Sequence, residues 1–152
     1  MKNCAFKLAL LFLLTSFGCQ APDDPSDPLE GAWKPTAYDL KSGESHSIDG
    51  SIFFQDGRWL VLFYVLDPDG NPVRGSAEGG AYSTLGDRLS LSHLSNLSSG
   101  EALPGLEASA LRMVLRREGE GTPEECGYRI EGDRLTIDFP SGNAMQFIRF
   151  GE

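Results

Sequence analysis

Apolar and polar residues alternate in short runs along the chain after residue 30. A period of two is typical of half-buried β-strands, and no segment keeps a helical period over three turns. The pattern predicts nine strands, at approximately residues 31–39, 48–54, 59–66, 79–84, 88–94, 109–117, 126–131, 134–139 and 144–150.

Short turns join most of these strands, and Asp56-Gly57 is the strongest hairpin signal because it suits the positive φ values of a type I′ turn. Consecutive hairpins favour an all-β fold, a small up-and-down antiparallel β-barrel of eight or nine strands whose closure removes the sheet edges. A β-sandwich is the alternative.

The segment 59–66 differs from the other strands because both of its faces are apolar. Trp59 and Val61 belong to one face, and Leu60 and Leu62 belong to the other. A one-sided sheet would alternate apolar with polar residues. We therefore expect a loop to bury the second face; contact with a partner protein or a membrane surface is the alternative.

Residues 95–108 form the longest stretch without a strand pattern. Scattered leucines, such as Leu103 and Leu106, predict that this stretch folds over another part of the domain as a lid or a mobile tip.

Gly31 and Trp33 lie at the start of the first strand, and Arg149 lies on the last. In a closed barrel these two strands are neighbours, so the guanidinium of Arg149 is expected over the indole of Trp33. Gly31 would allow the close backbone approach.

The first 18 residues predict a signal peptide, with Lys2 before an apolar core at 8–14 that is too short to span a bilayer. The following Ser16-Phe17-Gly18-Cys19 resembles a bacterial lipobox. The resemblance implies lipidation of Cys19 and a membrane-anchored protein of the bacterial cell envelope. The outer membrane is favoured, and its periplasmic or surface face stays open. Plain secretion is the alternative, with cleavage near Gly18 or after Ala21.

Residues 19–28 contain three prolines and three aspartates, which predicts an extended tether ahead of a domain at 29–152. Loss of residues 1–18 removes Lys2 and Lys7 and no acidic residue. This leaves 11 basic against 22 acidic residues and a net charge of −11. Such a charge disfavours nucleic acid as a partner. Cys126 is then left without a partner for a disulfide and is expected to be a buried small side chain.

Five motifs together resemble the lipocalin-like domains of bacterial lipoproteins over residues 29–150. They are Leu29-x-Gly31-x-Trp33, Asp56-Gly57-Arg58, Gly79-Gly80-x-Tyr82, the run from Tyr128 to Ile137, and Arg149. The resemblance implies a calycin-type barrel, in which Gly31, Trp33 and Arg149 close one end structurally and do not form a binding site. The chain differs from large lipocalins in being shorter and in having no long amphipathic helix between its last strands.

Candidate chemistry is sparse. His46 and His93 are far apart in sequence, and no catalytic or metal-ligand motif occurs. We expect no enzyme, no metal and no cofactor, although an isomerase or cyclase using His93, Tyr82 or Glu78 is an alternative. His93 itself is expected to be a core or rim residue.

A small hydrophobic ligand inside the barrel is the favoured hypothesis. The residues expected to line its cavity are Phe53, Val61, Phe63, Tyr82, Leu89, Leu91, Leu111, Met113, Tyr128, Ile137 and Phe147. The alternatives are a barrel filled by side chains and a non-enzymatic interaction module of the envelope, such as an inhibitor or assembly partner. The protein partner and the oligomeric state stay open.

Overall fold

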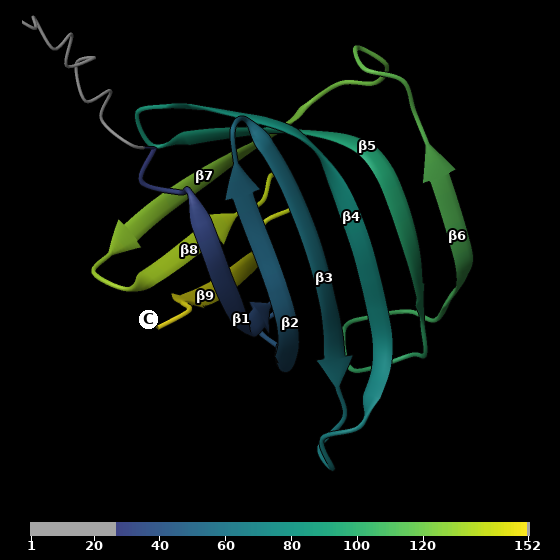
Figure 1. The fold of residues 1–152 in the computed structure, drawn as a ribbon. Coiled ribbons are helices and arrows are strands. Elements are labelled where there is room, and N and C mark those ends of the chain that lie inside the picture. The colour runs from purple at the N-terminus through teal and green to yellow at the C-terminus, as the bar shows by residue number, and fades with distance from the viewer. Residues whose placement is uncertain (1–26, 152) are drawn as a thin grey trace, which may run out of the picture.

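The computed structural model describes residues 27–151, which form nine β-strands (Figure 1). The strands are β1 (Gly31–Asp39), β2 (Ser45–Gln55), β3 (Arg58–Leu66), β4 (Pro72–Leu85), β5 (Arg88–Gly100), β6 (Ser109–Leu115), β7 (Glu124–Glu131), β8 (Arg134–Asp138) and β9 (Ala144–Arg149). The predicted signal peptide and Cys19 lie outside the described residues, and so does the predicted tether apart from its last two residues. No helix in the described range is long and apolar enough to cross a membrane.

Eight of the strands close into an antiparallel barrel, in which each strand pairs with its neighbours and β1 pairs with β9. The remaining strand, β6, lies outside this ring and pairs with β5 (Figure 1). The predicted all-β barrel is therefore confirmed, and its architecture is consistent with a lipocalin-like fold. The Asp56-Gly57 hairpin is also confirmed, with φ values of 49° and 70°.

The predicted seam between the first and last strands is present. Trp33 is opposite Arg149 in the β1–β9 register, and the Arg149 guanidinium lies 4.0 Å from the centroid of the indole. Arg149 also donates hydrogen bonds to the carbonyl oxygens of Glu30 and Pro28. Trp33 is fully buried, and its indole N–H donates to the Leu29 carbonyl. A Cβ atom on Gly31 would lie 3.2 Å from the Arg149 guanidinium, so glycine leaves room for this contact.

The barrel end next to this seam is filled by packed side chains. Its core contains Phe54, Tyr82, Leu89, Cys126 and Leu135. The T-shaped contact between Phe54 and Tyr82 joins β2 to β4, with ring centroids 5.0 Å apart. Packed side chains consequently fill the interior at this end.

A β-bulge divides β5 into two halves. Gly80 pairs with His93 and Gly79 pairs with Ser95, so Leu94 is the extra residue. Before the bulge, the odd-numbered residues Leu89 and Leu91 face the interior. After it, the even-numbered residues Asn96 and Ser98 face the interior. The first half of β5 pairs with β7, and the second half pairs with β6.

The strand assignment of residues 95–108 corrects the sequence prediction. Residues 95–100 continue β5 instead of forming a loop. The rest is a loop closed by reciprocal backbone hydrogen bonds between Leu103 and Leu106. Leu103 packs against the core, as the predicted fold-over requires.

The exposure of the outer face of β3 is the second difference from the sequence prediction, which expected a loop to bury it. Leu60, Leu62 and Tyr64 are exposed, and no loop of residues 27–151 buries them. The inward side chains of the same strand, Trp59 and Val61, are buried.

The direction of the apolar side chains of β6 is the third difference from the sequence prediction. Its apolar side chains were expected inside, but Leu111, Met113 and Leu115 are 62%, 73% and 88% exposed. Opposite the polar second half of β5, the strand turns Arg112 rather than its leucines toward the interior cavity.

Candidate ligand-binding site

A cavity of about 440 Å³ occupies the barrel interior beyond the packed end. This volume is within the range of small-molecule sites, roughly 300–1,000 Å³. One wall is apolar and comes from β2, β3, β8 and β9, with Leu91 of β5 beside them. Its principal residues are Ile52, Trp59, Val61, Phe63, Val65, Leu91, Ile137, Met145 and Phe147.

The other wall of the cavity is polar and comes from β4 to β7. Its principal residues are Arg74, Ser76, Glu78, His93, Asn96, Ser98, Ser99, Ser109, Arg112 and Glu124. The bulge at Leu94 creates much of this wall, because the parity change turns Asn96 and Ser98 inward. The cavity is therefore two-sided, with apolar and polar surfaces facing a common space.

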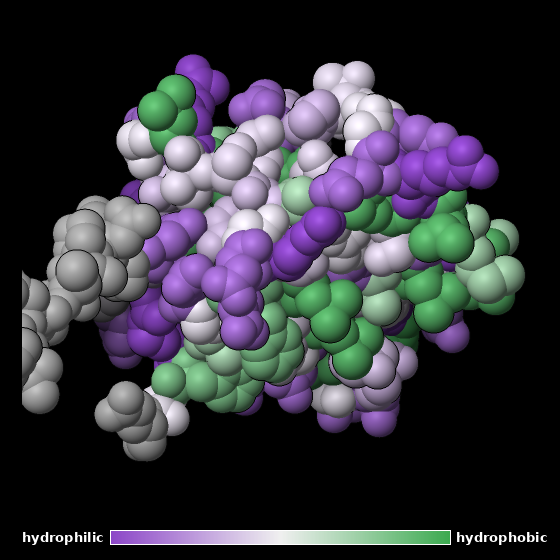
Figure 2. Space-filling view, turned by 45° about the horizontal axis from the view of Figure 1, so that its top comes forward, coloured by the Kyte–Doolittle hydropathy of each residue, from purple (hydrophilic) through white to green (hydrophobic). Residues whose placement is uncertain are grey.

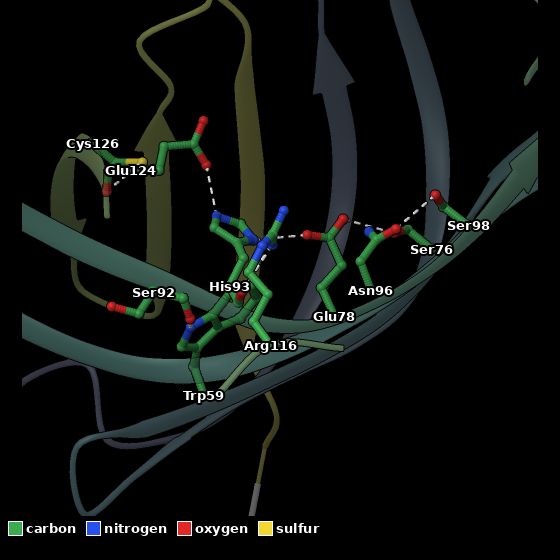
Figure 3. A network of polar contacts seen from close by, with 10 residues as sticks. All are labelled: Trp59, Ser76, Glu78, Ser92, His93, Asn96, Ser98, Arg116, Glu124 and Cys126. Atoms are coloured by element: carbon green, nitrogen blue, oxygen red, sulfur yellow. Dashed lines mark hydrogen bonds and ion pairs between the residues drawn. The ribbon is translucent and has the colours of Figure 1, made fainter. Parts of the chain in front are cut away.

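His93 is the centre of the polar wall (Figure 3). Its Nδ1 lies 2.9 Å from Oε2 of Glu78, and its Nε2 lies 3.1 Å from Oε2 of Glu124. The ring also meets Trp59 edge to face, with centroids 5.1 Å apart. Four strands, β3, β4, β5 and β7, thus meet at a single side chain.

The two glutamates control the charge of His93. Hydrogen bonds to Glu124 and Glu78 outweigh the effect of burial and raise the pKa of His93 to about 9. At neutral pH the imidazolium donates from both nitrogens. Burial alone would raise the pKa of Glu78, but hydrogen bonds from His93 and Ser76 lower it below its usual value. The cluster therefore carries one positive and two negative charges inside the barrel.

The backbone around His93 is held in place by two further side chains. The Arg116 guanidinium donates to the His93 carbonyl, 3.0 Å away, and the indole of Trp59 donates to the Ser92 carbonyl, 3.2 Å away. Gly80, opposite His93, is required here because a Cβ atom would overlap the Ser92 carbonyl oxygen. The bulge thus fixes the direction of the imidazole.

A second cavity of about 390 Å³ lies beside the first, where β5 changes partner from β7 to β6. The loop between β6 and β7 lines it through Glu120, Gly121, Thr122 and Pro123. Both cavities share the side chains of Glu78, His93, Asn96, Arg112 and Glu124. The side chains of the polar wall are therefore accessible from both cavities.

The loop 101–108 extends from β5 to the β1–β2 turn at one edge of the main cavity. Leu106 lines the cavity, and the Pro104 carbonyl lies 2.9 Å from Nε2 of His46 on β2. Arg74 donates to the carbonyl oxygens of Glu101 and Glu107, near the two ends of the loop. The loop is thus fastened to β2 and β4 and covers part of the opening.

Five of the eleven residues predicted to line a cavity do so: Val61, Phe63, Leu91, Ile137 and Phe147. Tyr82 and Leu89 are buried in the packed end, and Tyr128 is partly buried against the core. Phe53, Leu111 and Met113 are exposed on the outer face, so their expected inward direction is wrong. The polar wall was not predicted, because nothing in the sequence marks the bulge that creates it.

Of the residues named in the enzyme alternative, His93 and Glu78 are hydrogen-bonded to each other, whereas Tyr82 is buried in the packed end. Cys126 is fully buried, as predicted, and burial raises the pKa of its thiol to about 12. Residues 27–151 contain no group of three or more His, Cys, Asp or Glu side chains placed to hold a metal ion.

No known protein family matches this chain, and no curated protein sequence is significantly similar to it.

Proposed function

We propose that the barrel binds a small amphipathic molecule, with its hydrophobic body on the apolar wall and its polar group toward Arg112 and Asn96. One observation supports this proposal above all: a two-sided cavity of about 440 Å³ remains inside an otherwise packed barrel. A barrel filled by side chains, the alternative from the sequence, would leave no such space.

Arg112 narrows the chemistry of the polar group. It lines both cavities, and its guanidinium makes none of the ion pairs found within residues 27–151. His93, by contrast, is already paired on both nitrogens. A hydrogen-bond acceptor on the ligand, such as a carbonyl or carboxylate oxygen, would complement Arg112.

The test uses two neighbouring residues of β3. Val61 lines the cavity, whereas Leu62 is exposed on the outer face. An environment-sensitive apolar fluorophore should bind the purified protein, and Val61→Trp should weaken this binding at least tenfold by filling the cavity. The matched variant Leu62→Trp should leave it unchanged. No saturable binding, or equal effects of the two variants, would count against the proposal.

We further propose that the protein is a lipoprotein of the bacterial envelope, anchored through Cys19. The lipobox-like sequence before Cys19 supports this location, and two or more acyl chains would anchor the domain durably. The wild-type protein should enter the detergent phase in a Triton X-114 partition, and Cys19→Ala should remain in the aqueous phase. Aqueous partitioning of both would favour plain secretion.

An interaction module is the second candidate function. Apolar side chains gather on one side of the molecule, from the lower middle of Figure 2 to its right edge. The exposed residues of this outer apolar face come from β2, β3, β5 and β6, namely Phe53, Leu60, Leu62, Tyr64, Leu97, Leu111, Met113 and Leu115. Recovery of a stoichiometric protein from solubilised envelope would support this function.

A further inference from the structure

We propose that β6 is a homodimer interface, at which two copies of this chain pair their β6 strands antiparallel about a two-fold axis at Met113. In the described part of the chain β6 pairs only with β5, so its opposite edge is free (Figure 1). Such an edge is a template for adding another strand.

The backbone groups at this free edge belong to the odd-numbered residues. The N–H of Arg116 donates to the Leu94 carbonyl, so the even-numbered residues direct their polar backbone groups toward β5. The backbone N–H and C=O groups of Leu111, Met113 and Leu115 therefore point away from β5. The side chains of these three residues are exposed, as are those of Ser109, Ala110 and Arg112 on the same strand.

Natural proteins protect sheet edges with charged side chains, prolines or bulges. The three outward side chains of β6 include no charge and no proline. The neighbouring strand continues the same surface, because Leu97 pairs with Met113 and is also exposed. The edge thus has the character of an interface.

The sequence of β6 identifies the partner as a second copy. Its outward residues read leucine, methionine, leucine in both directions around Met113. In an antiparallel pair centred there, Leu111 of each copy lies opposite Leu115 of the other. Arg112 lies opposite Val114, so the two positive charges of these arginines do not meet directly. A two-fold interface needs this self-complementary pattern.

Charge at the two ends of the strand agrees with the same register. Glu107 precedes β6, and Arg117 follows it. Pairing about Met113 places Arg117 of one copy opposite Ser109 of the other, with Glu107 two residues away and diagonally across. Opposite charges therefore meet at both ends of the shared ribbon, at positions related by the two-fold axis.

Cysteine crosslinking tests the register. Paired Met113 residues would have Cα atoms about 5.5 Å apart, whereas paired Leu111 residues would be offset by four positions, roughly 14 Å. In the full chain, purified in mild detergent, Met113→Cys should give a covalent dimer with a short bifunctional thiol reagent. Leu111→Cys should give no more dimer than the unaltered chain, whose Cys126 is buried. Equal crosslinking of both variants, or none of either, would overturn the proposal.

Charge reversal provides an independent test by sedimentation velocity. Arg117→Glu and Glu107→Arg, each alone, should raise the dimer dissociation constant severalfold, and the double variant should restore it. Met113→Pro, which removes an N–H from the free edge, should raise it at least tenfold while the circular dichroism of the barrel is kept. Leu62→Glu, away from the edge, should leave dimerisation intact. A protein that stays monomeric at all concentrations would contradict the proposal. Binding of the outer apolar face to lipid vesicles without any dimer would contradict it as well.

Discussion

Arg149 lies against the indole of Trp33 with its guanidinium carbon 4.0 Å from the ring centroid, and this contact joins the last strand of the barrel to the first. The same guanidinium donates to two carbonyl oxygens of the segment before β1. The contact thus closes the barrel and fixes the start of the domain.

Loss of this guanidinium should destabilise the barrel. Arg149→Met keeps much of the aliphatic length but removes the cation–π contact and both hydrogen bonds. We expect the free energy of unfolding to fall by about 1–3 kcal/mol, as measured in urea. Arg149→Lys should lose less, because it keeps the charge. A change below about 0.5 kcal/mol for Arg149→Met would contradict the structural role.

Gly80→Ala should be among the most damaging small substitutions in the domain. The added methyl group would overlap the Ser92 carbonyl at the bulge, so the two strands must separate. We expect a loss of about 2 kcal/mol or more in thermal or urea unfolding. The control is Gly127→Ala, where the nearest atom to the added Cβ lies 3.7 Å away. Equal effects would mean that the close approach at Gly80 is unimportant.

His93 makes stability depend on pH in a defined direction. Its pKa is raised in the folded state to about 9, so the protonated form stabilises the fold. This contribution is fully present below the ordinary pKa of about 6.5 and is lost as the pH rises through about 9. The loss should be about 1–3 kcal/mol, seen in urea unfolding at pH 6 and pH 10. His93→Gln should remove most of this dependence.

The glutamates can be separated by NMR titration of the His93 ring. Glu124→Gln and Glu78→Gln should each lower the pKa of His93, since each carboxylate accepts a hydrogen bond from one nitrogen of the ring. An unchanged His93 pKa in both variants would contradict the geometry of the cluster.

Arg74 should control the loop 101–108. Arg74→Ala removes the hydrogen bonds to the carbonyl oxygens of Glu101 and Glu107. We expect the amides of Leu103 and Leu106 to exchange hydrogen about tenfold faster, because the loop opens more readily. Arg88→Ala, an exposed arginine near the opposite end of β5, should leave their exchange unchanged.

The sequence predicts the seam of the barrel because the patterns of the first and last strands can each be recognised from neighbouring residues. Gly31, Trp33 and Arg149 lie near the ends of clearly alternating segments, and a closed sheet makes those segments neighbours. Turn chemistry is similarly local, as at Asp56-Gly57. Closure and hairpin order follow from these features.

The candidate site could be predicted only in part. Ile137 lies between Thr136 and Asp138 in a strand that alternates apolar and polar residues, so a period of two gives its correct inward direction. The bulge at Leu94 depends on the close approach of Gly80 to β5, and no period reveals it. Asn96 and Ser98 therefore turn inward from a strand, although the sequence pattern predicts no strand at residues 95–108.

The strand β6 shows a different limit. Alternation reveals that Leu111, Met113 and Leu115 share one face of the strand, but it does not say on which side the core lies. Arg112 faces the cavity because the interior at this point is polar. The apolar face of β6 is an outer surface, whereas an apolar strand face usually lies against the core.

Methyl NMR of the purified protein with the apolar fluorophore tests the binding account most directly. Addition of the fluorophore should shift the methyl signals of Val61 and Ile137 with saturation at one molecule per barrel. The signals of Leu62 and Leu115 should stay in place. Shifts confined to Leu62 and Leu115, or no saturable shift of the interior methyl groups, would contradict a ligand site inside the barrel.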